Sequence, residues 1–370
     1  MRIGVLTYHF ANNYGAALQT YCLQAVLQEK GIETEIIDYQ SSLQKSNNAV
    51  FLNSSSVVNI MKNIIRFPHY YARKERINKF NDFRKKLNIT SEIFHEIDDV
   101  IEFAKNRYDA IVVGSDQVWN PAAPDFDDIY FRISKINIPV YAYAVSLGKA
   151  KKAELSKFRD DIVRFSDISV REDVSVDILR KVDNQIIAKG VLDPTLLLEK
   201  RMIENVVYQP VRPKENYIAC YYLGRKDALK FKKAVKQLAG KFNLDVYYIN
   251  ANYGIASYGK NVISNYGPKE FLGFLKNARL VCTNSFHATA LSIRFNIPFL
   301  SFENSVKDTR KVDLLRRLGI VNRLVENFDI SNIETYELPQ IDFEERLDVY
   351  RNVSLDFFDA LIQKCDCNQV

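Results

Sequence analysis

A histidine, the side chain best suited to proton transfer near neutral pH, lies at a predicted strand end, where ligands commonly bind. His287 follows an apolar run, 279–282, that ends in small polar residues including Asn284 and Ser285, and it precedes a run of Ala and Leu. This order predicts a histidine at the carboxyl end of a strand and at the start of a helix, where ligands gather in open α/β sheets. The other three of the four histidines lack this setting. A buried histidine that only completes the loop is the alternative interpretation.

A second polar segment, 12–19, lies between the first predicted strand and the first predicted helix. Asn13, Tyr14 and Gly15 suit a tight turn, because Asn and Gly tolerate backbone conformations that other residues avoid. The N–H groups at the helix start would then face the ligand edge of the sheet, where an anion or a sugar hydroxyl could bind. The segment lacks the glycine pattern of a dinucleotide-binding turn, and an ordinary strand-to-helix turn fits it equally well.

The segment 114–121 follows another predicted strand and contains the sole tryptophan. Asp116 is a candidate to bind or deprotonate a hydroxyl, and Trp119 is a candidate to stack on a sugar ring. Ser115 and Gln117 are candidate substrate-binding residues in the same turn. A capped turn with a buried tryptophan is the alternative.

Two basic segments supply candidate anion-binding groups. Arg171 follows an apolar strand, and a guanidinium there can bind a phosphate or a carboxylate through two N–H groups. A structural ion pair with Glu172 or Asp173 is the alternative. Lys307 and Arg310 open a predicted helix, where side-chain cations and the positive helix end together favour an anion, although a solvated helix start fits them too.

Alternating strands and helices must position these segments, and they form two successive series. The alternation predicts an α/β protein with two Rossmann-like domains that face a cleft, at 1–195 and 215–340, joined by a proline-bearing linker at 199–215. An amphipathic run within 341–370 predicts a final helix that packs back on the first domain. We expect the first domain to bind the acceptor and the second the donor. The expected strands are 2–7, 33–39, 109–114, 139–145, 167–171, 217–223, 245–249, 279–282 and 298–302, and the expected helices include 16–30, 70–87 and 151–165.

Composition limits the classes of function. The chain of 370 residues is 47 % hydrophobic, has five cysteines without metal-ligand spacing, and contains no apolar run long enough for a bilayer. We therefore expect a reduced cytoplasmic protein with no signal peptide and no metal site. The formal charge of +6 is modest, so the basic run near 70–87 favours a solvated helix face. An anionic ligand or the anionic inner face of a membrane is the alternative partner of this run.

The four polar segments together resemble those of the polysaccharide pyruvyl transferase family, in the same order and at suitable intervals over nearly the whole chain. The resemblance implies a fold like that of the GT-B glycosyltransferases. It also implies a transferase that moves a pyruvate unit from phosphoenolpyruvate to two hydroxyls of a sugar, as a cyclic ketal, in the synthesis of a bacterial capsular polysaccharide or exopolysaccharide. The matching stretches are 13–19, 114–120, 169–173, Asp193-Pro194-Thr195, 286–288 and the Arg310 segment before 314–319.

The resemblance also implies roles for single residues. The family's histidine maps onto His287, a general acid for the enol carbon of the donor, and its Ser-x-Arg arginine maps onto Arg171. Many members have an arginine two residues before that histidine, where this chain has Ser285. A serine cannot supply that cation, so the donor phosphate must be bound by Arg171, Arg310 or Lys307.

The expected partners are phosphoenolpyruvate as donor substrate and a sugar acceptor, on a lipid carrier or a growing polysaccharide, without a cofactor and without nucleic acid. A GT-B-type glycosyltransferase that uses a nucleotide-sugar fits the same predicted fold, because a fold does not fix a function. A catalytically silent protein that binds a sugar or an anion is a third interpretation, which Ser285 supports.

Overall fold

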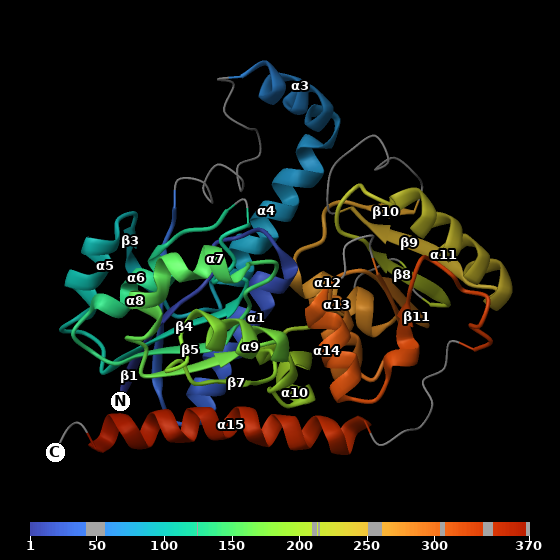
Figure 1. Cartoon of the computed structure of the whole chain (residues 1–370). Coiled ribbons are helices and arrows are strands. Elements are labelled where there is room, and N and C mark those ends of the chain that lie inside the picture. The colour runs from blue at the N-terminus through green and yellow to red at the C-terminus, as the bar shows by residue number, and fades with distance from the viewer. Residues whose placement is uncertain are drawn as a thin grey trace. The chain divides into compact units, whose positions relative to one another are not determined.

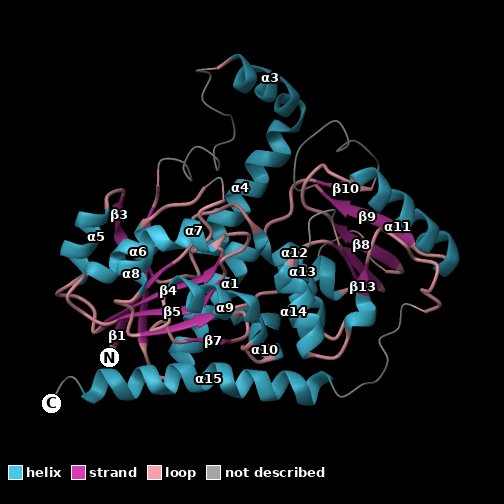
Figure 2. Cartoon of the chain, viewed as in Figure 1, coloured by secondary structure: helices cyan, strands magenta, loops and turns pink. Residues whose placement is uncertain are grey.

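The computed structural model describes residues 1–41, 56–123, 125–208, 213, 215–250, 261–303, 308–335 and 343–367 (Figure 1). The chain divides into two compact units, and neither is one continuous stretch of sequence. Each unit contains one parallel sheet flanked by helices (Figure 2). The first unit is Met1–Asn48, Arg84–Leu198 and Glu345–Val370, and the second is Ala49–Phe83 and Glu199–Glu344.

The sheet of the first unit has seven parallel strands in the order β3-β2-β1-β4-β5-β6-β7. The order changes direction between β1 and β4, and ligands bind at such a switch point in open α/β sheets. The central strands β4 and β5 are buried along almost their whole length, as expected of a parallel sheet covered on both faces. The strands are β1 (Arg2–Leu6), β2 (Glu33–Tyr39), β3 (Ile89–Phe94), β4 (Ala110–Asp116), β5 (Val140–Val145), β6 (Asp167–Val170) and β7 (Ala188–Gly190).

The sheet of the second unit has six parallel strands in the order β10-β9-β8-β11-β12-β13. Its order changes direction between β8 and β11, so this unit repeats the plan of the first. The two sheets with flanking helices confirm the prediction of two Rossmann-like domains. The strands are β8 (Tyr217–Tyr221), β9 (Asp245–Ile249), β10 (Val262–Ile263), β11 (Leu280–Thr283), β12 (Phe299–Phe302) and β13 (Leu324–Val325).

The helices connect successive strands. In the first unit they include α1 (Tyr14–Glu29), α5 (Ile97–Ala104), α6 (Ile129–Arg132), α7 (Lys152–Leu155), α8 (Arg159–Ile162) and α9 (Asp173–Val182). The single helix expected at 151–165 is interrupted, because the 3-10 turn η3 (Ser156–Phe158) separates α7 from α8. In the second unit they include α3 (Val57–Arg66), α4 (Tyr70–Arg84), α10 (Lys200–Glu204), α11 (Ala228–Phe242), α12 (Pro268–Lys276), α13 (Phe286–Arg294) and α14 (Thr309–Arg317).

The division into units differs from the expected domains over Ala49–Phe83. We expected this stretch to belong to a continuous first domain, but α4 packs within the second unit. Arg76 Nη1 donates a hydrogen bond to Asn250 O at 3.2 Å, and Lys79 Nζ lies 3.3 Å from Glu270 Oε1. The sequence pattern identifies a helix here, but it carries no information about which sheet the helix joins.

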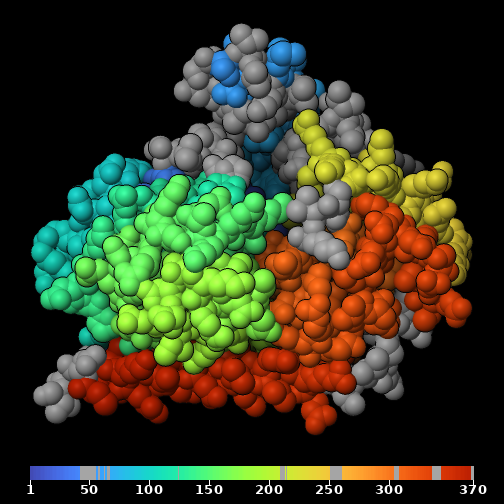
Figure 3. Space-filling view, in the orientation of Figure 1, coloured from blue at the N-terminus to red at the C-terminus, as the bar shows by residue number. Residues whose placement is uncertain are grey.

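The last helix, α15 (Phe343–Cys367), packs along the first unit with its residues from Glu345 onwards, and Figure 3 shows its red surface below the green surface of that unit. Phe358 lies against Tyr143, with ring centroids 4.4 Å apart. Leu192 N donates to Ser354 Oγ at 2.9 Å. Through these contacts α15 packs against Tyr143 of β5 and against Leu192. No helix within the described ranges is both long enough and apolar enough to cross a bilayer.

Asn13 begins α1 through its side chain, whose Oδ1 accepts hydrogen bonds from the N–H groups of Gly15 (2.8 Å) and Ala16 (3.3 Å). Replacing Asn13 with Ala should therefore lower the free energy of unfolding by about 1 kcal/mol. Asn13→Ser is the matched control, because a serine hydroxyl can cap the same helix. Urea unfolding of the three proteins measures the difference, and an alanine variant as stable as the parent would contradict the expectation.

Candidate functional site

Polar residues of the first unit follow the carboxyl ends of neighbouring strands. Because all strands are parallel, these ends meet at one edge of the sheet. The residues are Thr7 after β1, Ser115 and Asp116 at the end of β4, Ser146 after β5, Arg171 after β6 and Asp193 after β7. Candidates predicted from distant parts of the sequence, Asp116 and Arg171, are therefore brought together in this unit.

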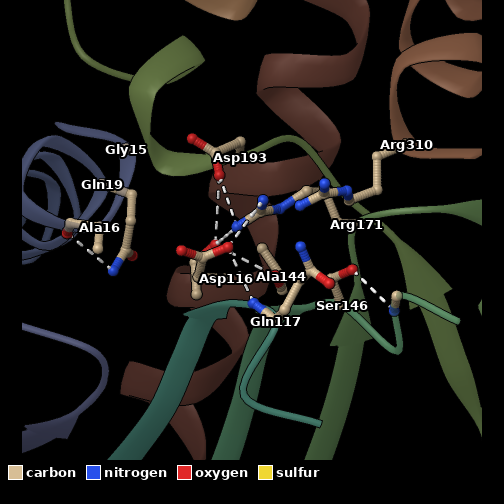
Figure 4. A network of polar contacts seen from close by, with 12 residues as sticks. Gly15, Ala16, Gln19, Asp116, Gln117, Ala144, Ser146, Arg171, Asp193 and Arg310 are labelled. Atoms are coloured by element: carbon tan, nitrogen blue, oxygen red, sulfur yellow. Dashed lines mark hydrogen bonds and ion pairs between the residues drawn. The ribbon is translucent and has the colours of Figure 1, made fainter. Parts of the chain in front are cut away.

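Arg171 is the cation of this edge, and its side chain is only 2 % exposed. Its Nη2 lies 2.8 Å from Asp193 Oδ2 and donates to Ser115 Oγ at 2.5 Å (Figure 4). Its Nη1 lies 3.6 Å from Asp116 Oδ1, where the two charges attract without a normal hydrogen bond. The guanidinium therefore faces carboxylates from β4 and from the segment after β7.

Asp193 is the main structural partner of Arg171. Its side chain is fully buried, and its second oxygen, Oδ1, accepts hydrogen bonds from Thr195 N (2.9 Å) and Thr195 Oγ1 (2.6 Å). The sequence suggested Glu172 as an ion-pair partner of Arg171, but Glu172 Oε1 accepts from Ser146 Oγ at 2.7 Å. The Asp193-Pro194-Thr195 motif thus holds the arginine in place.

Asp116 is the more accessible carboxylate of this network, with a side chain that is 14 % exposed. Its Oδ1 accepts a hydrogen bond from Gln117 N at 2.9 Å. Burial raises the pKa of the nearby Asp125, and the charge of Asp116 raises it further. Burial likewise raises the pKa of Tyr8, with Asp116 among the charges that add to the effect. Asp116 therefore lies between a cation and other acidic groups, a setting suited to binding or deprotonating a hydroxyl.

The prediction that Trp119 stacks on a sugar is wrong for this structure. The side chain is fully buried, stacks on Phe131 at a centroid distance of 5.0 Å, and donates from Nε1 to Tyr130 O at 3.0 Å. The indole is thus enclosed in the core and has no face open to a sugar. Gln117 supports the same turn, because its Oε1 accepts from Asn120 Nδ2 at 2.9 Å. The alternative interpretation of a capped turn with a buried tryptophan applies.

The turn before α1 also differs from its expected role. The N–H groups of Gly15 and Ala16, which we expected to bind a ligand, donate to Asn13 as described above, and Tyr14 is buried in the first turn. Sequence reasoning overlooked Gln19, which is fully buried and donates from Nε2 to Thr7 Oγ1 at 2.9 Å. Its Oε1 has no hydrogen-bond partner among the described residues and is a candidate acceptor for a substrate hydroxyl.

His9 was overlooked as well, although it has the setting that the sequence assigned to His287 alone. It follows β1, precedes α1 and is buried, with Nε2 2.9 Å from Asp38 Oδ1 and Nδ1 3.2 Å from Thr7 O. Arg84 supports this corner by donating from Nη2 to Asn12 Oδ1 at 2.8 Å, and burial lowers its pKa to about 10. Both ring nitrogens of His9 face acceptors, so the residue is held rigidly.

In the second unit, the predicted residues after β11 form the start of α13. Ser285 is the N-cap and accepts from Ala288 N at 3.4 Å. Asn284 joins β11 to the end of β8, because its Oδ1 accepts from Leu223 N (2.6 Å) and its Nδ2 donates to Leu223 O (2.8 Å). His287 lies in the first turn of α13, largely buried and edge-on to Phe286 at 5.2 Å. The histidine thus occupies the strand-end position that the sequence predicted.

A second basic group follows β12. Asp308 binds the guanidinium of Arg310 through two hydrogen bonds, from Nε (2.9 Å) and Nη2 (2.8 Å). Burial raises the pKa of Asp308, but the charge and hydrogen bonds of Arg310 outweigh this, so the pKa lies below its usual value. The guanidinium of Arg310 also lies over the ring of Phe286, 5.5 Å from its centroid. Lys307 lies outside the described residues.

Lys311, the residue after Arg310, is a buried cation that was not among the predicted site residues. It is 1 % exposed and donates from Nζ to Phe302 O at 2.6 Å, at the end of β12. Burial lowers the pKa of Lys311 to about 8, although Asp308 and Glu303 act in the opposite direction. The sequence signal that could have identified Lys311 was its position one residue after Arg310. Among the described residues, no group of three or more His, Cys, Asp and Glu side chains has the arrangement to hold a metal ion.

The lowered pKa of Lys311 has a measurable effect on stability. Between the folded pKa of about 8 and the ordinary value of 10.5, the unfolded chain binds more protons at this residue than the folded protein does. The stability of the parent should therefore rise relative to Lys311→Met, by about 2 kcal/mol from pH ~7 to ~9.5. Denaturant unfolding across this range measures the difference. Lys236→Met, at an exposed lysine of α11, is the control and should show no such trend.

A family model described as polysaccharide pyruvyl transferase matches residues 13–306. The chain therefore belongs to the polysaccharide pyruvyl transferase family. The matched range includes Asp116, Arg171 and His287, and Arg310 follows it. No curated protein matches this sequence.

Solved structures of other enzymes share the fold of this pyruvyl transferase family member. An alpha-glucosyltransferase in complex with UDP and a 13-mer DNA is 11 % identical, with 96 % of this chain and 90 % of that chain covered and a TM-score of 0.50. The UDP-GlcNAc 2-epimerase of Methanocaldococcus jannaschii is 12 % identical, with 96 % and 93 % covered and a TM-score of 0.49. At such low identities the comparison concerns the fold alone, and the match at a TM-score of 0.50 agrees with the predicted GT-B-like fold of two Rossmann-like domains.

Proposed function

We infer that membership of the family makes this protein a transferase with a sugar or polysaccharide acceptor. We propose that this protein transfers a pyruvate unit from phosphoenolpyruvate to two hydroxyls of a sugar, as a cyclic ketal, in the synthesis of a polysaccharide or a lipid-linked glycan. The observation that carries this proposal is the family match over residues 13–306. We further propose that it acts in the cytoplasm, at the inner face of the membrane where lipid-linked sugars are made.

The donor carries a phosphate and a carboxylate, and both require fixed cations. Arg171 suits one of these groups because Asp193 and Ser115 hold its guanidinium in one orientation. Arg310 suits the other, since Asp308 binds it through Nε and Nη2. With Ser285 in place of the family's arginine, these two side chains are the proposed replacements for the missing cation.

The reaction needs a proton at the methylene carbon of the donor. His287, as an imidazolium, gives this proton, and the electron pair of the carbon–carbon double bond forms the new C–H bond. A sugar hydroxyl then attacks the cationic carbon C2 and loses its proton to Asp116. A second hydroxyl displaces phosphate from C2 and closes the ketal. Asp116 then releases the proton of the first hydroxyl to solvent and His287 regains one from solvent, while the proton of the second hydroxyl leaves with phosphate, so the products are the ketal and inorganic phosphate.

A single assay tests this function. The purified protein is incubated with phosphoenolpyruvate and a panel of simple and lipid-linked galactosides, mannosides and glucosides. Release of phosphate together with a sugar product of the mass of a pyruvate ketal is the expected result. Release of a nucleotide from a nucleotide-sugar, without consumption of phosphoenolpyruvate, would show a glycosyltransferase. Binding of donor or sugar without either product would show a silent binding protein.

A further inference from the structure

An exposed apolar stripe runs along α3, the 3-10 turn η1 (Phe67–His69) and the first turn of α4. It consists of Ile60, Met61, Ile64, Phe67 and Tyr71, which are 45, 61, 67, 71 and 83 % exposed. The spacing of Ile60, Ile64, Phe67 and Tyr71 repeats every three to four residues, as on one face of a helix. We call these five residues the α3 patch. Single exposed apolar residues are ordinary, but such a continuous set indicates an interaction surface.

The opposite face of α3 is polar. The residues at positions 59, 62, 63 and 66 are Asn, Lys, Asn and Arg, whereas positions 60, 61 and 64 hold apolar residues. A helix of a soluble core would bury its apolar face, but here that face is exposed. Apolar residues on one face and Lys and Arg on the other are typical of helices that lie in the boundary layer of a membrane.

The helix α4 fixes the end of this surface to the second unit. Phe80 is fully buried, Lys79 forms its ion pair with Glu270, and Asn265 Nδ2 donates to Glu75 Oε2 at 2.8 Å. Figure 1 shows α3 and α4 as consecutive helices joined at η1. The α3 patch is therefore attached to an anchored helix. The sequence favoured a solvated face for the basic run near 70–87, with an anionic ligand or a membrane as the alternative partner. In the structure Arg76 and Lys79 of this run form contacts inside the unit.

The charge around the patch favours one kind of partner. Residues 56–74 contain no Asp or Glu, and their cations are Lys62, Arg66, the exposed Lys74 and the buried Arg73. A second copy of the chain would place these like charges against each other. An anionic bilayer offers both an apolar interior and a negative headgroup layer, so it complements the patch in both respects.

We propose that the α3 patch docks the protein on an anionic membrane. The five apolar side chains enter the boundary between headgroups and acyl chains, and the exposed Lys74 beside the patch binds the anionic headgroups. This role goes beyond the proposed reaction, because docking requires neither donor nor acceptor. If the acceptor is a lipid-linked sugar, docking concentrates the enzyme where that sugar is located.

Vesicle flotation of the full chain tests the docking. The parent should float with vesicles of phosphatidylcholine and phosphatidylglycerol, float much less with phosphatidylcholine alone, and be released by salt. The double substitution Ile64→Asp with Phe67→Asp should weaken binding by more than about tenfold, because it places two charges in the apolar boundary. Leu229→Asp changes another residue of the second unit that is 80 % exposed, and it should bind like the parent. Thermal melts of both variants confirm that they are folded.

Three outcomes would overturn the proposal. One is a parent that does not bind anionic vesicles, and another is a double variant that binds them as well as the parent does. The third is a parent that is dimeric by light scattering and a double variant that is monomeric, since the patch would then join two copies of this chain. Phosphate release with a soluble sugar should be unchanged in the double variant, so a failure of docking is distinguishable from a failure of the proposed reaction.

Discussion

Replacing His287 with Gln should reduce kcat for phosphate release from phosphoenolpyruvate by about 10²–10⁴-fold, the usual contribution of a general acid. The side chain lies at a strand end, in the first turn of α13, so glutamine should be accommodated without loss of the fold. Donor binding should persist in part, because the proposed donor cations, Arg171 and Arg310, are unchanged. Glutamine has no acidic proton to give to carbon, so the loss should appear in kcat.

Phosphate-release assays, together with thermal melts, measure these effects. His95→Gln is the matched control, since His95 is an exposed histidine of the first unit whose Nδ1 lies 2.8 Å from Gln40 O. A folded His287→Gln protein with the turnover of the parent would remove His287 from catalysis. A variant that unfolds would instead favour the interpretation of a buried structural histidine.

Replacing Arg171 with Ala should affect both stability and turnover. The substitution leaves the fully buried Asp193 without its cation, which should lower the free energy of unfolding by about 3–5 kcal/mol. It should also raise KM for the donor and lower kcat. Arg171→Lys should recover only part of the activity, because a lysine keeps the charge but not the paired N–H groups. Denaturant unfolding and donor titration measure the two effects.

A double variant separates the two roles of Arg171. In Arg171→Met with Asp193→Asn, no buried charge is left unpaired, so much of the lost stability should return. Turnover should stay low, since the donor still lacks its cation. Recovery of turnover together with stability would show that Arg171 only supports the structure.

The interiors of both sheets were predictable because long apolar runs bounded by turn residues are typical of parallel strands. β5 is buried throughout, and its predicted bounds agree with the structure to one residue. The strands β3, β7, β10 and β13 were missed. They form the edges of the two sheets, and β10 and β13 have only two residues each, so they carry no apolar run of useful length.

The candidate site was predictable as a set of strand ends, but not as a set of contacts. Arg171 could be placed after its strand, whereas its partner Asp193 lies beyond the next helix and strand and is joined to it only by folding. Trp119 shows that local sequence does not reveal the role of a side chain. A tryptophan in a core and one that stacks on a sugar have the same local sequence. His9 and His287 have the same kind of setting, and nearby Ala and Leu residues drew attention to only one of them.

The path of the chain sets the order in which the first unit can be completed. The chain passes between the units after Asn48, Phe83, Leu198 and Glu344. On the ribosome, the last strand of the first sheet has emerged at Gly190, but Tyr143 and Leu192 still lack Phe358 and Ser354 of α15. The longer segment of the second unit, Glu199–Glu344, is synthesised in the interval. The domain made first is therefore the domain finished last, with one side open to solvent, and to chaperones, until translation has passed α15.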